Sequence, residues 1–412
     1  MESLSVGACI DVLYPFTHGG AERRYALLTR ELAARGHDVT VYTLKWWDGP
    51  VYQRGGVRHV AVGDPARLYA NGDRRSLLQP ARYALRATSG VPKARHDVVD
   101  CNQFPYLHIP PARLQAMVRG HALAVTWHEV WQRYWYRYAP LPAGLFGAAL
   151  ERVAHRLAPL NVAVSRHTAD RLLELGAAPS RVAVVPDPIN LPRIRQAPPR
   201  GDPTDVLYVG RLIAHKRVDR LLAAVAKLRE RRRGVHCTIV GDGPDGARLR
   251  ALSRGLGLQD HVTFTGALPD AAAVVGAMKD ARVFVSASER EGFGMAPLEA
   301  MACGVPVVTV AGPMNATATE LVADGVDGVV VPKPDCRALA AALDKLLDDE
   351  AARRRMGDAA RKKAEAYDAP RVAVTLEATY LRLLRPGSER RPARPPPPVA
   401  APALAAGVPG GP

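Results

Sequence analysis

The sequence predicts an α/β fold in which two doubly wound parallel-sheet domains follow one another along the chain. Short β-rich runs alternate with helical patterns over nearly the whole length, which is typical of parallel sheets covered by helices on both faces. A stretch rich in Pro, Arg and Gly interrupts the alternation at residues 191–205 and has the composition of an interdomain linker. The length of 412 residues is too great for one compact core and suits two.

The first half of the chain shows the alternation from its start. An apolar run at residues 6–14 predicts a strand, and residues 21–35 predict a helix with Tyr25, Leu28 and Leu32 on one face. Gly36 ends that helix. Further strands are expected at 38–44, 57–62, 97–101, 122–127, 161–165 and 182–185. We therefore expect a first Rossmann-like domain at residues 1–193.

The second half repeats this architecture without repeating the sequence. After the linker, strands are expected at 206–209, 237–240, 262–265, 282–286, 305–310 and 328–331. They predict a second Rossmann-like domain at residues 204–370, followed by a C-terminal helix at 371–385. Residues 386–412 are rich in Pro and Arg and can bury almost nothing, so this tail is expected to be disordered.

The composition indicates a folded protein of a reducing compartment. Hydrophobic residues make up 48% and charged residues 23%, which excludes wholesale disorder and a disulfide scaffold. Five scattered cysteines form no Cys-x-x-Cys pair, and the longest apolar stretch, at 300–314, is too short and too interrupted to span a membrane. No secretory signal is expected either, because the first residues lack a basic leader. The expected location is the cytoplasm.

The net charge of +16 is the unusual feature of the composition. A surplus of Lys and Arg attracts phosphate, whether in a nucleotide, an anionic membrane or a nucleic acid. Base composition alone also produces chains rich in Arg and Ala, and that explanation stays open. The basic residues are spread along the chain and form no known nucleic-acid module, so no nucleic-acid partner is expected.

The most informative segment is SASEREGFGMAPLEAMACGVPVV, residues 286–308. Its start follows a predicted strand, where open parallel sheets bind ligands, and its glycines let the backbone approach a bulky group. The free N–H groups of the following helix turn favour a phosphate. Glu291, expected in the loop, and Glu299, expected one turn into the helix, flank this position, and each can accept hydrogen bonds from sugar hydroxyls. The residues expected to line the site between them are Gly292, Phe293, Gly294, Met295 and Ala296.

Two glutamates with seven residues between them, in the setting EGFGxxxLEAMACGxPVV, resemble the signature of retaining glycosyltransferases of the GT-B fold, family four. The resemblance implies transfer of a sugar from a UDP- or GDP-sugar to a hydroxyl of a glycan, lipid-linked or small-molecule acceptor. It also implies that Glu291 holds the hydroxyls of the donor sugar and that Glu299 holds the ribose of the nucleotide. No cofactor is implied beyond the donor itself.

The segment VGRLIAHKRVDRLLAAVAKL, residues 209–228, extends the resemblance. It implies that Arg211 and Lys216 contact the donor diphosphate, and two such cations can neutralise a diphosphate without a metal ion. The chain contains no Asp-x-Asp motif, so no metal is expected in the site. Arg217 stands where the family usually has glycine.

Three further positions match the family. Gly19 and Gly20 resemble the glycine pair that approaches the donor phosphate from the first domain. Thr265, in the stretch HVTFTGALPD, lies where relatives seat the base, and His128 ends a predicted strand where many relatives have a histidine that faces the donor sugar. Together the matches run from about residue 6 to about residue 380.

The segment WQRYWYRY, residues 131–138, allows several interpretations. With Trp46 and Trp47 it could stack on an acceptor sugar, rest at a membrane interface or pack in the core as a lid. Peripheral attachment to the inner face of an anionic membrane therefore stays open. The alternatives to a transferase are a nucleotide-sugar epimerase or phosphorylase of the same fold, a non-catalytic nucleotide-sugar-binding protein, and a basic nucleic-acid-binding protein.

Overall fold

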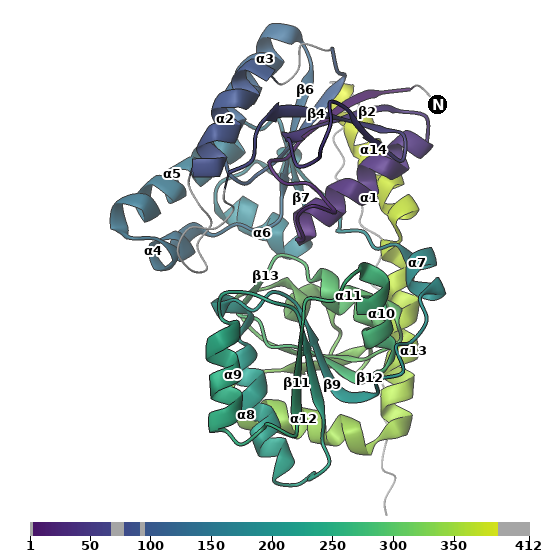
Figure 1. Ribbon diagram of the computed structural model, residues 1–412. Helices are drawn as coiled ribbons and strands as arrows, with labels where there is room; N and C mark the ends of the chain where they lie inside the picture. The colour runs from purple at the N-terminus through teal and green to yellow at the C-terminus, as the bar shows by residue number, and fades with distance from the viewer. Residues whose placement is uncertain (1–2, 67–77, 91–94, 386–412) are drawn as a thin grey trace, which may run out of the picture.

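The computed structural model describes residues 3–66, 78–90 and 95–385 and has two halves, each built on its own sheet (Figure 1). The tail at 386–412, for which disorder is predicted, lies outside the described residues. The α/β architecture with two doubly wound sheets agrees with the sequence-based prediction. Short helical turns lie at Gln132–Tyr134, Pro179–Arg181, Ala214–Lys216, Thr317–Leu321 and Glu365–Tyr367.

The N-terminal half contains an eight-stranded sheet in the order β3-β4-β2-β1-β5-β6-β7-β8. Its strands are β1 (Ser5–Cys9), β2 (Asp38–Leu44), β3 (Tyr52–Arg54), β4 (Val57–Gly63), β5 (Val98–Asn102), β6 (Ala122–Trp127), β7 (Leu160–Ala163) and β8 (Val182–Val184). All neighbours are parallel except β3 and β4, which form an antiparallel edge. β3 is missing from the sequence-based prediction. The strand predicted at 6–14 ends at Cys9, where the chain stops pairing with the neighbouring strands. Ile10 and Leu13 nevertheless stay buried.

Helices cover both faces of this sheet. They are α1 (Gly20–Ala34), α2 (Leu78–Gly90), α3 (Ile109–Arg119), α4 (Trp135–Tyr138), α5 (Leu141–Leu157) and α6 (Arg166–Glu174). Successive side chains of a strand point to opposite faces. Val98 therefore packs with the core beneath α1, and its neighbour Val99 packs with the core beneath α2, α3 and α5.

The C-terminal half contains a six-stranded parallel sheet in the order β11-β10-β9-β12-β14-β16. Its strands are β9 (Thr204–Val209), β10 (Cys237–Val240), β11 (Val262–Gly266), β12 (Ala281–Ser286), β14 (Val307–Val310) and β16 (Gly328–Val331). Its helices are α8 (Val218–Arg229), α9 (Gly246–Gly255), α10 (Ala271–Lys279), α11 (Met295–Ala302), α12 (Cys336–Asp348) and α13 (Glu350–Ala364). Cores on the two faces of the sheet lie beneath α8, α9 and α12 and beneath α10, α11 and α13.

Two segments join the halves. The stretch at 191–205, predicted as a linker, begins with a short helix, α7 (Leu191–Gln196), because the Asn190 side chain caps it by accepting from the Arg193 N–H. The last described helix, α14 (Ala369–Leu384), returns to the N-terminal half and packs beside α1 (Figure 1). The hydroxyl of Tyr380 in α14 donates to the Asp100 carboxylate at 2.6 Å. The N-terminal half therefore contains the first described strand, β1, and also packs against the last described helix, α14.

Candidate active site

α11 begins after a glycine-containing loop at the carboxyl end of β12, where open parallel sheets bind ligands. Gly294 precedes the helix with a φ of 105°, a left-handed conformation that favours glycine. The N–H groups of Met295 and Ala296 lie in the first turn, where the helix offers them no carbonyl. This helix start therefore has the geometry of an anion site.

Gly292 lies where the two halves of the protein touch. A Cβ atom at this position would lie 1.7 Å from the backbone oxygen of His128, so no residue with a side chain fits there. The hydroxyl of Ser165, also from the N-terminal half, donates to the Gly292 carbonyl at 2.7 Å. The loop before α11 is thus held directly by the opposite half.

Lys216 and Glu291 form a close ion pair beside this loop. Their Nζ and Oε1 atoms lie 2.6 Å apart, and the Ser288 hydroxyl donates to the same carboxylate oxygen at 2.8 Å. Glu291, expected in a loop, lies in the two-residue strand β13 (Arg290–Glu291), which pairs with β15 (Met314–Asn315). The pairing with β15 orients the Glu291 side chain, which the local sequence does not reveal.

The surroundings of Lys216 are strongly positive. Burial and then the charges of three cations lower the pKa of His215 to about 2; these cations are Arg290, Lys216 and Arg211. Arg211 follows β9, and its backbone oxygen accepts from the buried Tyr208 hydroxyl at 3.0 Å. Burial raises the pKa of Tyr208; the charge of Glu291 raises it further, and the charge of Arg211 lowers it. Arg211, Lys216 and Glu291 therefore share one electrostatic environment.

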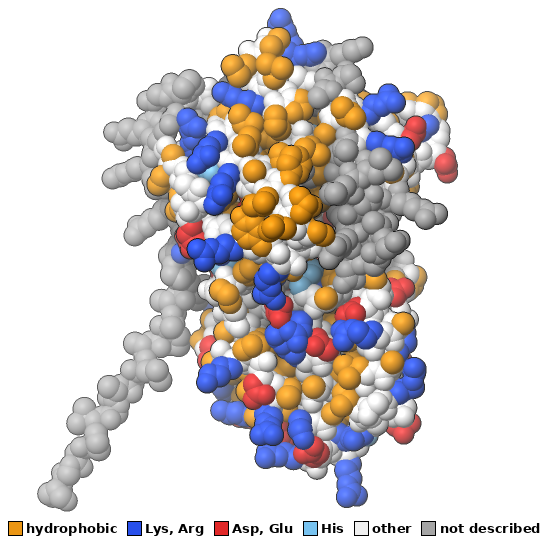
Figure 2. All heavy atoms as spheres, turned by 90° about the vertical axis from the view of Figure 1, so that its left-hand side faces the viewer, with side chains coloured by type: hydrophobic (Ala, Val, Ile, Leu, Met, Phe, Trp, Pro, Cys, Tyr) orange, Lys and Arg blue, Asp and Glu red, His pale blue; other side chains and the backbone are white. Residues whose placement is uncertain are grey.

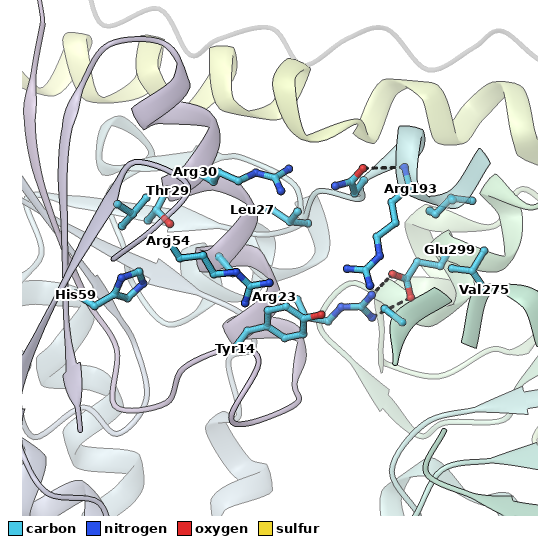
Figure 3. A pocket seen from close by; sticks show the side chains of 15 residues that line it. Tyr14, Arg23, Leu27, Thr29, Arg30, Arg54, His59, Arg193, Val275 and Glu299 are labelled. Atoms are coloured by element: carbon cyan, nitrogen blue, oxygen red, sulfur yellow. Dashed lines mark hydrogen bonds and ion pairs between the residues drawn. The ribbon is translucent and has the colours of Figure 1, made fainter. Parts of the chain in front are cut away.

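Glu299, the second motif carboxylate, is ion-paired with Arg23 of α1. Both guanidinium nitrogens of Arg23 contact the carboxylate, one of them at 3.0 Å (Figure 3). Glu299 is only 4% exposed, and its charge raises the pKa of Arg23. A ribose that is to bind Glu299 must therefore displace Arg23 or share the carboxylate with it.

A cleft of about 110 Å³ lies beside this ion pair, between the two halves (Figure 3). Glu299 is the one carboxylate among its described lining residues. The basic side chains that line it are Arg23, Arg30, Arg54 and Arg193. Arg211, Lys216 and Glu291 do not line it, so the cleft adjoins the expected nucleoside end of the site and not the sugar end.

The glycine pair of the N-terminal half lies at the start of α11. A Cβ atom on Gly20 would lie 3.6 Å from the Met295 sulfur, an ordinary contact distance. Gly19 is the N-cap of α1 in an extended conformation. The structure therefore brings Gly20 and Met295 together.

His128 lies at the end of β6, but its ring is turned toward a buried acid. Its Nδ1 atom lies 3.9 Å from the Asp187 carboxylate, which is itself paired with Arg24 at 3.1 Å. Burial and then the charge of Arg24 lower the pKa of His128 to about 3, so the ring is neutral near pH 7. Burial also raises the pKa of Asp187 to about 6. The His128 Nε2 atom is buried and has no hydrogen-bond partner among the described residues.

Two predicted residues have their side chains engaged elsewhere. The ring of Phe293 is 3% exposed and packs against Tyr367 in the core, so only its backbone can face a ligand. The Thr265 hydroxyl donates to the carbonyls of Ile239 and Gly266 within its own sheet. The motif spacing places these residues in the correct segment but does not show which way their side chains point.

Arg290 is a residue of this site that the sequence analysis does not identify. Its guanidinium forms an ion pair with Glu129 and lies 4.3 Å from the ring centre of Trp131 and 4.7 Å from that of Tyr134. The two rings belong to the segment WQRYWYRY, and the ring centres of Trp131 and Trp135 lie 4.6 Å apart. This part of the segment therefore packs around Arg290. Its position directly before the motif residue Glu291 is the feature of the sequence that could have identified it.

The described residues contain neither a metal-binding cluster nor a membrane-spanning helix. Over residues 3–66, 78–90 and 95–385, no group of three or more His, Cys, Asp or Glu side chains could hold a metal ion. Within the same part of the chain, no helix is long and apolar enough to cross a membrane.

Comparison with known families assigns both halves of the chain. Residues 18–193 match the family described as Glycosyltransferase Family 4, and residues 192–363 match Glycosyl transferases group 1. A GDP-mannose-dependent alpha-(1-6)-phosphatidylinositol monomannoside mannosyltransferase from Mycolicibacterium smegmatis is 30% identical over 84% of this chain and 91% of its own. A D-inositol 3-phosphate glycosyltransferase from Kineococcus radiotolerans is 30% identical over 92% of this chain and 93% of its own.

Solved structures share the arrangement of the two halves. Sucrose-phosphate synthase from Thermosynechococcus elongatus superposes with a TM-score of 0.79 at 22% identity, covering 92% of this chain and 99% of its own. HepE from Anabaena, solved in complex with UDP-glucose, superposes with a TM-score of 0.69 at 18% identity, covering 92% of this chain and 100% of its own. At these identities the likeness concerns the fold alone.

Proposed function

The chain belongs to the group 1 and family 4 glycosyltransferases of the GT-B fold, and from this premise we propose that it transfers a sugar from a nucleoside-diphosphate sugar to a hydroxyl group, with retention of configuration. The acceptor in this proposal is a glycan, a lipid-linked sugar or a small molecule. The observation that carries the proposal is the contact of Lys216 with Glu291 beside the start of α11, in the field of Arg211.

In the proposed complex, the diphosphate lies at the start of α11. The N–H groups of Met295 and Ala296 donate to it, and Arg211 and Lys216 neutralise its charge. Glu291 accepts from the sugar hydroxyls, and Glu299 accepts from the ribose once Arg23 has moved. Gly19 and Gly20 close the site from the N-terminal half, and the base lies near Thr265. No metal ion or cofactor is required.

The proposed chemistry is a front-face substitution. The bond from the anomeric carbon to the diphosphate oxygen breaks, and the acceptor oxygen bonds to the same face of the oxocarbenium-like sugar. The proton of the acceptor hydroxyl passes to the departing diphosphate, which acts as the base. Glu291 is assigned to hydroxyl binding, so no carboxylate is assigned as a nucleophile. His128, neutral near pH 7, can hydrogen-bond the sugar through Nε2 and need not act as a base.

The proposed donor is a UDP-sugar or a GDP-sugar, so its base is uracil or guanine. The Mycolicibacterium relative is named for GDP-mannose, and the Anabaena structure holds UDP-glucose, so the comparisons favour neither. A non-catalytic nucleotide-sugar-binding protein and an epimerase of the same fold are the alternatives. Both would bind the donor without acceptor-dependent release of nucleoside diphosphate.

The test is incubation with UDP-, GDP- and ADP-sugars, scored for nucleoside-diphosphate release with and without candidate acceptors. A thermal-shift panel of the same donors first identifies which one binds, because a ligand of the folded state raises its stability. Release that requires an acceptor supports the transferase. Binding without release, under all acceptors tried, would favour the binding protein instead.

We also propose that the enzyme works in the cytoplasm, with its acceptor presented at the inner face of the membrane. The scattered cysteines and the net charge of +16 support this location.

A further inference from the structure

The solvent face of α5 carries large apolar side chains over its first four turns. Its exposed large side chains are Leu141 at 68%, Leu145 at 52%, Phe146 at 58% and Val153 at 44%. The opposite face of the helix is buried against the N-terminal half and includes Gly144, Gly147 and Ala148. Because burial of that face already stabilises the helix, its own packing does not explain the exposed apolar face.

α3 and α2 extend this apolar surface. α3 packs against α5 and exposes Leu114 at 63%, Met117 at 66% and Val118 at 76%. α2 packs against α3 and exposes Leu85 at 71%. Figure 2 shows hydrophobic side chains gathered on this face of the N-terminal half. Contiguous apolar patches are uncommon on monomers and mark interaction sites. We name the exposed side of α2 to α5 the helical face.

The charges of the helical face have a single sign. The basic residues on α2 to α5 and the turn at 132–134 are Arg82, Arg86, Arg113, Arg119, Arg133, Arg137, Arg152 and Arg156. Glu151 is the one acidic residue in these elements, and it is 0% exposed, accepting from the N–H groups of Trp131 and Gln132. The helical face therefore combines exposed apolar side chains with an exclusively positive surface charge.

This combination points to one kind of partner. A second copy of the chain, docked symmetrically, would bring arginines against arginines. A lipid surface offers acyl chains to Phe146 and Leu145, and lipid phosphates to Arg152 and Arg156 at the end of the same helix. We propose that the helical face docks on an anionic membrane surface, with the apolar side chains of α3 and α5 inserted at the headgroup level.

The proposal is independent of the transfer reaction, since none of these residues belongs to the candidate active site. It assigns part of the +16 charge to a defined surface instead of to base composition. It also places the membrane contact on helices, whereas Trp131 of the aromatic segment packs against Arg290.

The experiment is flotation of the full chain with vesicles of phosphatidylcholine alone or mixed with phosphatidylglycerol. Wild-type protein should bind the mixed vesicles, and added salt should weaken the binding. Replacing Arg152 and Arg156 by Gln should lower affinity about 25-fold, since each arginine near such a surface contributes roughly a factor of five. The matched control replaces Arg355 and Lys362, both exposed on α13 of the other half, and should leave affinity unchanged.

A second pair of variants tests the apolar contribution. Leu145→Gln with Phe146→Gln should lower affinity about ten-fold or more. The matched control, Leu173→Gln with Val374→Gln, changes residues exposed on α6 and α14 and should leave the affinity for vesicles unchanged. All four positions are exposed, and an unchanged thermal midpoint verifies the fold.

Three results would overturn the proposal. They are equal binding to neutral and anionic vesicles, equal losses in test and control variants, and no vesicle binding by the wild-type chain. Binding of duplex DNA that depends on Arg152 and Arg156, without vesicle binding, would assign the face to nucleic acid.

Discussion

Three charged side chains, Arg211, Lys216 and Glu291, carry the proposed chemistry of the candidate site. Lys216 forms an ion pair with Glu291, with Nζ and Oε1 2.6 Å apart. Its ammonium group therefore lies where the sugar and the diphosphate are proposed to meet. A cation held in this way stabilises the transition state more than the bound donor, because negative charge develops on the leaving group during the reaction. The transfer step is therefore expected to depend on these cations more than donor binding does.

Replacing Arg211 or Lys216 by Ala should lower turnover about 100- to 1000-fold, the typical effect of losing one donor that stabilises developing charge. The thermal midpoint should stay near that of the wild type. Lys227→Ala, on the exposed side of α8, is the matched control and should leave turnover unchanged. Near-normal turnover of Arg211→Ala would refute its assignment to the diphosphate.

The pair of His128 and Asp187 predicts a dependence of stability on pH. His128 has a pKa of about 3 in the folded protein, so the unfolded chain binds its proton more tightly, and this residue makes stability fall as pH drops from about 6.5 toward 3. Asp187, with a pKa of about 6, acts in the opposite direction, because its contribution is lost as pH rises from about 4 through 6.

His128→Gln should therefore change the slope of unfolding free energy against pH by about −1.4 kcal/mol per pH unit between pH 4 and 6, which leaves the opposite contribution of Asp187 uncompensated. Urea unfolding at a series of pH values measures this slope. Identical slopes for variant and wild type would show that His128 is not buried in its neutral form.

At this scale the sequence predicts the charged motif residues but not their partners. Arg211, Lys216, Glu291 and Glu299 are recognisable from local spacing. Arg23 contacts Glu299 across 276 positions of the chain, and no local pattern reports such a contact. The direction of the Phe293 ring is likewise set by packing against Tyr367, a distant residue in the sequence.

At the scale of elements, the loop from β12 to α11 is positioned by both halves, because β15 of its own half pairs with β13 and the opposite half adds further contacts. His128 contacts Gly292, Ser165 donates to the Gly292 carbonyl, and Glu129 with two aromatic rings holds Arg290. Because Arg290 adjoins Glu291 in β13, its position affects where that carboxylate lies. We infer that Arg290 is a positioning residue.

Arg290→Met should lower turnover about 10- to 100-fold while changing the dissociation constant for nucleoside diphosphate little, because displacement of reacting groups affects the transfer step most. Titration calorimetry and steady-state kinetics together separate the two effects. Arg282→Met, which removes an ion pair with Asp205 at the other end of the sheet, is the control. Equal losses in both variants would indicate a general loss of stability instead.

The elements that sequence patterns predict well are those with strong local periodicity. β2, β6, β10 and β16 have the predicted bounds, since each is a buried apolar run between turn residues. β3, β13 and β15 have only two or three residues each, too few for a local pattern: β3 pairs with β4 across the turn at Gly55 and Gly56, and β13 pairs with β15. The helix α7 in the predicted linker is not evident from the sequence, because the composition of residues 191–205 indicates a linker and the capping contact of Asn190 appears only in the structure.

At the scale of the whole molecule, α14 connects the two halves. Its Glu377 pairs with Arg35 of α1, and its Tyr380 reaches Asp100 beneath the N-terminal sheet. The candidate site lies between these halves, with cations on both sides: Arg23 and Arg54 from one, Lys216 and Arg193 from the other. We expect metal-independent transfer because these protein cations can neutralise the diphosphate in place of a metal ion.

Turnover should therefore be unchanged by EDTA. Assays with and without chelator, followed by re-addition of magnesium or manganese, measure this directly. An enzyme silenced by EDTA and restored by either ion would contradict the assignment of Arg211 and Lys216 as sufficient for the diphosphate.

The anomeric configuration of the product tests the central claim, retaining transfer from a nucleotide sugar, most directly. NMR of the purified product should show the same configuration at the anomeric carbon that the donor sugar had, because the acceptor attacks the face that the diphosphate leaves. A product of inverted configuration would contradict the account.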